Sequence, residues 1–251
     1  MSCCSKDSVH PVCDWYGIHC NQEEQIEIIR LPGTLLDSTL PTELGRLNAL
    51  QVLDLSGNVL RGSIPTEILK LPMLADLSLS NNLLSGSFPA AIFLSPSLLK
   101  ASLGHNQLEG SIQLPPPEAI AFVSRIQELS LEANYFTGAI PPPLCTVATE
   151  LVRLNLARNK LVGAIRTQFE LCESLMYLDL SDNLLQGPLP TRLSYQLKSL
   201  FLDHNEFTGT VPLEYSLKTQ LEDLMIQGES HCYHQHHNTK HVLMLCALIF
   251  I

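Results

Sequence analysis

Two sets of side chains in this sequence are of types that bind ligands. The first is a run near the end of the chain whose nitrogen and sulfur atoms could hold a metal: His231, Cys232, His234, His236, His237 and His241. A structural zinc site needs two pairs of ligands, each pair held on a fixed turn. The spacing in this run does not supply such pairs, so we expect a polar tail with no bound metal and no cofactor.

The second set combines a cation, two carboxylates and two aromatic rings: Arg153, Tyr177, Asp179, Phe201 and Asp203. Arginine can hold a carboxylate through two hydrogen bonds, and aromatic side chains are frequent among residues that dominate binding energy. These five residues could recognise a ligand if the fold brings them together. No motif of a kinase, a serine hydrolase or a zinc protease accompanies them, so we expect no enzyme and no catalytic residue.

The segments that would position the second set are repeats. The stretch LDLSGNVLRGSIP at residues 53–65 recurs as LSLSNNLLSGSFP at 77–89 and as LDLSDNLLQGPLP at 178–190. Seven copies place an asparagine at spacings of 24, 24, 28, 25, 24 and 22 residues: Asn58, Asn82, Asn106, Asn134, Asn159, Asn183 and Asn205. Two degenerate copies flank them, with Thr34 and Glu229 at the asparagine position.

Each repeat predicts one coil of a stacked array. The alternating leucines predict a short strand with one face buried. The asparagine lies where the chain leaves the strand, and its amide can bond to backbone groups that the turn leaves unpaired. Successive asparagines should therefore stack as a ladder. A single coil would expose its leucines, whereas stacked coils bury them in one core.

A repeat of about 20–29 residues with the pattern L-x-x-L-x-L-x-x-N is typical of leucine-rich repeats. The form LxLxxNxLxGxIPxxLxxL found here resembles the plant-type leucine-rich repeat. The resemblance implies an α/β repeat fold, namely a right-handed solenoid with one parallel strand per coil in a concave sheet and short helical segments on the convex side. We expect an N-terminal cap over residues 1–25, eight to nine coils over 26–229, and a tail outside the fold over 230–251.

The cap carries cysteines. CDWYGIHC at residues 13–20 matches the C-x-W-x-G-[VI]-x-C core of the plant-type cap. The resemblance implies a Cys13–Cys20 disulfide, with Trp15 covering the open end of the first coil. Such a bridge would indicate an oxidising compartment, whereas the alternative is a reduced pair that packs as small hydrophobic residues.

The other cysteines have no evident pairing. Cys145 and Cys172 fall in adjacent coils but two positions out of register, and we expect them to be buried thiols. The remaining four are left without a partner: Cys3, Cys4, Cys232 and Cys246.

The solenoid would bring the second set together on its concave face. Asp179 and Phe201 occupy the same column of successive strands, and Tyr177 and Asp203 lie diagonally beside them. The equivalent positions of earlier coils are mostly small and polar. We therefore expect ligand contact in coils five to seven, with a merely solvated face as the alternative.

Composition narrows the partners. The 251 residues include 15 Lys and Arg and 25 Asp and Glu, which gives a formal charge of −10. This charge argues against binding to nucleic acid and to anionic lipid surfaces. The resemblance implies a protein, peptide or glycan ligand.

The resemblance also implies a role. We expect a non-catalytic recognition module, namely a receptor-like ectodomain or a fragment of one in signalling, and the alternative is a secreted inhibitor of wall-degrading enzymes. No apolar signal-peptide region is visible in MSCCSKDSVHPVC, so either the chain is cytosolic or the native chain starts upstream of this sequence. The cysteines favour the second alternative, with the chain at the cell exterior or membrane-attached. The apolar stretch 242–251 is shorter than the ~20 residues of a membrane helix. It could be a truncated membrane segment, a lid on the last coil or a non-native end, and membrane contact is expected only through a missing or truncated segment.

Overall fold

The computed structural model describes residues 12–116, 124–142, 144–165 and 168–226. Several sequence-based expectations lie outside these residues: those on Cys3, Cys4, the histidine-rich run, Glu229 and Cys246. The division of the chain at residues 25 and 229 stays a prediction.

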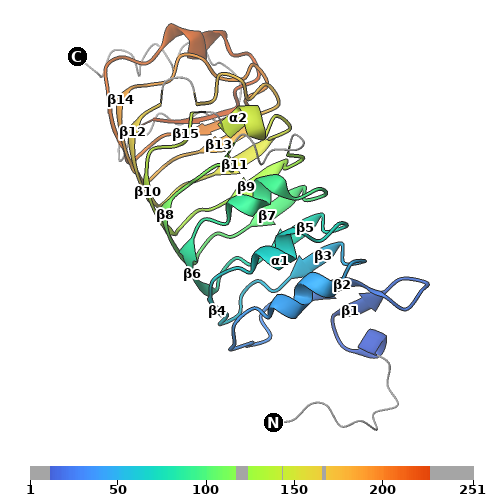
Figure 1. The fold of residues 1–251 in the computed structure, drawn as a ribbon. Coiled ribbons are helices and arrows are strands. Elements are labelled where there is room, and N and C mark those ends of the chain that lie inside the picture. The colour runs from blue at the N-terminus through green and yellow to red at the C-terminus, as the bar shows by residue number, and fades with distance from the viewer. Residues whose placement is uncertain (1–11, 117–123, 143, 166–167, 227–251) are drawn as a thin grey trace.

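The main sheet of the described residues has ten strands stacked along the array (Figure 1). All neighbouring strands are parallel except the first pair, which is antiparallel. In order, they are β1 (Ile18–Cys20), β2 (Ile26–Arg30), β3 (Val52–Asp54), β5 (Asp76–Ser78), β7 (Lys100–Ser102), β9 (Glu128–Ser130), β11 (Arg153–Asn155), β13 (Tyr177–Asp179), β15 (Ser199–Phe201) and β17 (Asp223–Met225). The structure thus confirms the predicted leucine-rich-repeat solenoid with a parallel sheet.

A second parallel sheet runs along one side of the coils, and it corrects the prediction of one strand per coil (Figure 1). Its seven strands are β4 (Arg61–Gly62), β6 (Leu83–Ser87), β8 (Gln107–Ser111), β10 (Tyr135–Gly138), β12 (Lys160–Ala164), β14 (Leu184–Pro188) and β16 (Glu206–Thr208). Six of these strands begin at the residue after an asparagine, and β4 begins three residues after Asn58. Each is extended because a leucine or phenylalanine two residues after the asparagine points into the core, and stacking then lets the backbone groups of neighbouring coils pair.

Short helices return the chain from the second sheet to the next strand of the main sheet. They are the 3₁₀ helices η2 (Thr42–Arg46), η3 (Ala90–Leu94) and η5 (Leu213–Leu217), and the α-helices α1 (Thr66–Leu69) and α2 (Leu144–Val147). A proline stands at the N-cap of four of them: Pro41, Pro65, Pro89 and Pro212. Proline has no N–H to leave unpaired there and limits φ, so it marks the start of the return segment.

One hydrophobic core fills the interior of all coils. From β3 onward the middle residue of each main-sheet strand points into it, and Leu53, Leu77, Leu154, Leu178 and Leu200 are each 0% exposed. The residues on either side of that leucine face outward, as the burial pattern of β3, β5 and β13 shows. The alternation predicted from the sequence is therefore the one that separates core from surface.

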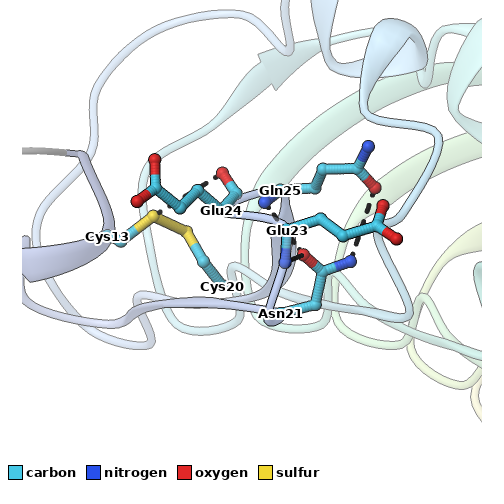
Figure 2. Close-up of a disulfide and its surroundings, with 6 residues drawn as sticks. All are labelled: Cys13, Cys20, Asn21, Glu23, Glu24 and Gln25. Carbon is cyan, nitrogen blue, oxygen red and sulfur yellow. Dashed lines mark hydrogen bonds between the residues drawn. A yellow bond between two sulfur atoms is a disulfide. The ribbon is translucent and has the colours of Figure 1, made fainter.

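The N-terminal cap is closed by the expected disulfide. η1 (Val12–Asp14) precedes β1, and Cys13 and Cys20 are bonded with their Cα atoms 5.5 Å apart (Figure 2). The turn after Cys20 is held by Asn21, whose Oδ1 accepts hydrogen bonds from the backbone N–H groups of Glu23 and Gln25 at 3.0 Å each. The bridge and this turn together bring β1 alongside β2.

The role predicted for Trp15 was wrong. Its residue surface is 51% exposed, and it is not part of the buried core. The residues that pack against the core at this end are Ile18, Ile26 and Leu31. Ile18 of the cap strand β1, which is hydrogen-bonded along β2, packs against the core at this end, so the indole is not needed there.

The prediction of buried thiols at Cys145 and Cys172 was also wrong. The two cysteines form a disulfide with a Cα–Cα distance of 5.1 Å, within the range that a bridge requires. Cys145 lies on α2, whereas Cys172 lies in a turn of the following coil. Because the two return segments differ in length and conformation, an offset counted along the sequence does not persist in space.

Candidate functional site

The asparagine ladder is the structural part of the site, because it fixes the coils relative to one another. Each asparagine Oδ1 accepts a hydrogen bond from the backbone N–H of the preceding coil at 3.0 Å. Each Nδ2 donates to carbonyl oxygens of its own coil and of the preceding coil, as Asn134 does to Leu131 and Leu103 at 3.1 Å. The ladder thereby holds the strands of the main sheet at a fixed spacing.

The candidate ligand-binding residues stand on three neighbouring strands of that sheet. In the register of β11, β13 and β15, Arg153 lies beside Tyr177, and Asp179 lies beside Phe201. The middle residue of each of these strands is a buried leucine. Arg153, Tyr177, Asp179 and Phe201 each stand next to such a leucine, so all four occupy outward-facing positions. The columns read from the sequence are therefore the ones that the sheet aligns.

The side chains of three of these residues stack in a row, which we call the aromatic row: Arg153, Tyr177 and Phe201. The guanidinium carbon of Arg153 lies 4.2 Å from the centroid of the Tyr177 ring. The rings of Tyr177 and Phe201 are tilted by 51°, with their centroids 5.6 Å apart. Both contacts have the geometry of favourable cation–π and aromatic pairs.

Asp179 is fixed in place beside the aromatic row. Its Oδ1 accepts hydrogen bonds from the backbone N–H and the hydroxyl of Ser181, at 3.0 and 2.7 Å. The phenol of Tyr177 donates to its Oδ2 at 3.3 Å. Burial, together with the charge and the hydrogen bond of Asp179, raises the pKa of Tyr177 to about 12. The phenol therefore stays protonated and able to donate at physiological pH.

Asp203 does not join this group through any contact within the described residues. Its Oδ2 lies 2.8 Å from Nδ1 of His204, and its side chain is only 15% exposed. The assignment of Asp203 to the ligand-contacting face stays a prediction. The direction of its carboxylate depends on a neighbour in the loop, which column counting does not consider.

Ser181 is the member of the site that sequence reasoning missed. It stands two residues after Asp179, and the pair Asp54 and Ser56 makes the same two hydrogen bonds in an earlier coil. Aspartate followed two residues later by an N–H and a hydroxyl is a local turn motif, so the D-x-S pattern could have revealed it.

The first half of the sheet carries different chemistry. Ser78 and Ser102 occupy the column of Asp179 and Phe201 in β5 and β7. Lys100 and Glu128 form an exposed ion pair of 2.8 Å. Burial raises the pKa of the nearby Asp76 carboxyl, although the positive charge of Lys100 opposes the rise. This half has no aromatic pair at the columns that carry Tyr177 and Phe201.

The described residues contain no group of three or more His, Cys, Asp and Glu side chains arranged to hold a metal ion. Within the same residues, no helix has the length and apolar character that a membrane crossing requires.

Comparison with known proteins gives the family. A family model described as Leucine Rich Repeat matches residues 49–71 and 174–195. The crystal structure of a Pollen Receptor Kinase 3 aligns with a TM-score of 0.58 and 32% identity, over 68% of this chain and 81% of that chain. This chain belongs to the plant-type leucine-rich-repeat family. Among curated proteins, none matches the leucine-rich-repeat chain by sequence.

Larger receptors share the same fold. A TDR receptor aligns with a TM-score of 0.68 and 29% identity, over 76% of this leucine-rich-repeat chain and 33% of the receptor chain. The ectodomain of the Arabidopsis thaliana membrane receptor kinase GASSHO1/SCHENGEN3, solved in complex with CASPARIAN STRIP INTEGRITY FACTOR 2, aligns with a TM-score of 0.53 and 30% identity. That alignment covers 85% of this chain and 31% of the ectodomain. The chain thus spans about a third of the length of each.

Proposed function

We propose that the chain is a non-catalytic recognition module of a receptor-like ectodomain, and that it binds a peptide or protein segment across the second half of the main sheet. The observation that carries the proposal is the aromatic row with Asp179 fixed beside it. Side chains already held in one arrangement lose little conformational entropy when a ligand binds, so their contacts contribute more to affinity.

Each part of the site offers a different contact. Within the described residues no hydrogen bond or ion pair engages the guanidinium of Arg153, so its N–H groups are available to a carbonyl or carboxylate of the ligand. The Tyr177 and Phe201 rings offer an apolar surface. Asp179 offers a negative charge to a basic group, and the acidic balance of the chain would speed the approach of such a ligand at low salt.

The likeness to receptor ectodomains supports this role. GASSHO1/SCHENGEN3 was solved in complex with a partner, at 30% identity to this chain. By that likeness, we infer that this chain also works by binding rather than by catalysis. Two disulfides in the described residues suit an oxidising compartment, so we place the module outside the cell or on the outer side of its membrane.

The test begins with a ligand selected by the chain itself. A random displayed-peptide library is panned on the purified chain, and one enriched peptide is titrated into wild type and variants by calorimetry. We expect Phe201→Ala and Asp179→Ala to weaken binding by roughly ten-fold or more.

Matched controls exist on the first half of the sheet. Asp54→Ala removes the same Asp–Ser hydrogen bonds as Asp179→Ala but stands in β3. Ser78→Ala and Ser102→Ala alter the column of Phe201. Equal losses from these variants, or no loss from the second-half pair, would move the site elsewhere.

A further inference from the structure

A pocket of about 480 Å³ lies between return segments of the last coils, away from the aromatic row. Six of its lining residues supply its chemistry: Glu170, Arg192, Tyr195, Glu214, Leu217 and Lys218. They come from three successive coils, on the segments that lead from β12 to β13, from β14 to β15 and from β16 to β17. A pocket of this size matches those that hold small molecules.

Lys218 is a buried cation within this pocket. The residue is only 5% exposed, and its ammonium donates hydrogen bonds to the carbonyl oxygens of Leu193 at 2.8 Å and Ser194 at 3.1 Å. It also lies 4.8 Å from the centroid of the Tyr195 ring. An ammonium has three donors, and two of them are used by these carbonyls.

No carboxylate of the described residues lies within ion-pair distance of this ammonium. A charge removed from water is costly unless an opposite charge compensates it. Burial accordingly lowers the pKa of Lys218. An anion brought into the pocket would supply the missing compensation.

The other charges limit what kind of anion fits. Arg192 forms an ion pair with Glu170, so that carboxylate is already balanced. Glu214 lines the same pocket and repels any anion there, by an amount that grows with the anion's charge. A group with one negative charge therefore suits the pocket better than a phosphate or a polyanion.

Apolar surface stands next to the cation. Tyr195 is 85% exposed and Leu217 is 75% exposed, although both line the pocket. Large apolar side chains exposed together on a rigid surface commonly mark a site where another molecule binds.

We propose that this pocket binds a small monocarboxylate with an aromatic or branched apolar body. The carboxylate accepts a hydrogen bond from the remaining N–H of Lys218, and the apolar body covers Tyr195 and Leu217. This site is separate from the one proposed for peptide recognition, so each can fail without the other.

The probe is phenylacetate, and phenylacetamide is its uncharged counterpart. Both are titrated into the full chain by calorimetry. We expect phenylacetate to bind with a dissociation constant on the order of 1 mM, and phenylacetamide to bind at least about ten-fold more weakly.

Variants then assign the contact. Lys218→Met is expected to weaken phenylacetate binding by about ten-fold or more, whereas Lys198→Met, which removes an exposed lysine that does not line the pocket, is expected to change it less than about two-fold. Tyr195→Ala alters an exposed residue and tests the apolar wall even if Lys218→Met unfolds the chain. Equal binding of the amide, equal loss from Lys198→Met, full affinity in Tyr195→Ala, or no saturation by phenylacetate up to about 20 mM would each overturn the proposal.

Discussion

At the residue scale, the asparagines show why a polar side chain is buried in every coil. Asn134 is only 5% exposed, yet it makes a full set of hydrogen bonds to backbone groups of two coils. Those backbone groups lie at the bend between the two sheets, where regular strand pairing does not satisfy all of them. The side chain is therefore a substitute for backbone pairing.

We expect Asn134→Ala to lower the free energy of unfolding by roughly 1–3 kcal/mol, because buried groups such as the Leu108 N–H and the Leu103 carbonyl lose their partner. Urea unfolding measures the change. Asn48→Ala is the control, because Asn48 is exposed in a turn and the same truncation should change stability little there. Equal stability of the Asn134→Ala variant and wild type would contradict the role of the ladder.

Tyr177 gives a prediction about pH. Its pKa is raised from 10.0 to about 12 in the folded chain, so the folded state holds this proton where the unfolded state has released it. The contribution of Tyr177 to stability is thus complete below about pH 10 and is lost as the pH rises through about 12. The difference in ultraviolet phenolate absorbance between wild type and Tyr177→Phe should show a late titration in the native chain and one near pH 10 in concentrated urea. A native midpoint near the urea value would refute the burial of this phenol.

At the scale of elements, the return segments pack against one another through a glycine. Gly45 in η2 faces α1 of the next coil, and a Cβ built on it would lie 2.6 Å from Cβ of Glu67 and 3.0 Å from its backbone. The contact is with the backbone and Cβ of Glu67, which cannot move aside as the end of a flexible side chain would.

We therefore expect Gly45→Ala to destabilise the chain by roughly 1–3 kcal/mol through overpacking between η2 and α1. Gly110→Ala is the informative comparison, since Gly110 has a φ of +79° but no atom within 4 Å of the added Cβ. That variant reports backbone strain alone, of roughly 1–2 kcal/mol. Thermal unfolding of both variants separates contact from strain, and an unchanged Gly45→Ala would show that the segments can move apart.

The strands and return segments differ in how well the sequence predicts them. The main-sheet strands were predictable because an inward leucine recurs at a nearly constant spacing, and Asp179 and Phe201 were placed as neighbours for the same reason. The second sheet was missed because its strands have a single inward residue, such as Leu84, with a glycine two residues later, and this gives no alternation to detect. The Cys145–Cys172 bridge was missed because return segments do not share the register of the strands.

At the scale of the whole molecule, the two disulfides act on different parts of the array. One closes the cap over a separation of 7 residues, and the other joins two coils over 27 residues. A longer closed loop removes more conformational freedom from the unfolded chain.

Removing the Cys145–Cys172 bridge should therefore lower the free energy of unfolding more than removing the Cys13–Cys20 bridge. We expect the paired alanine variant at Cys145 and Cys172 to lose roughly 3–4 kcal/mol, and the pair at Cys13 and Cys20 roughly 2–3 kcal/mol. Urea unfolding of oxidised wild type and both variants gives the comparison. Full alkylation of Cys145 and Cys172 in unreduced protein would show that the second bridge is absent.

The ladder of asparagines has a direction along the solenoid. Every asparagine supplies its oxygen to the coil before it, and Thr34 can stand in the first copy because no parallel coil precedes β2. The backbone N–H of a coil therefore finds its acceptor in the asparagine of the following coil, and not in the asparagine of its own coil. This polarity sets a rule for chimeras: a grafted block can begin without an asparagine only if it becomes the new first coil, whereas any block joined downstream must bring one.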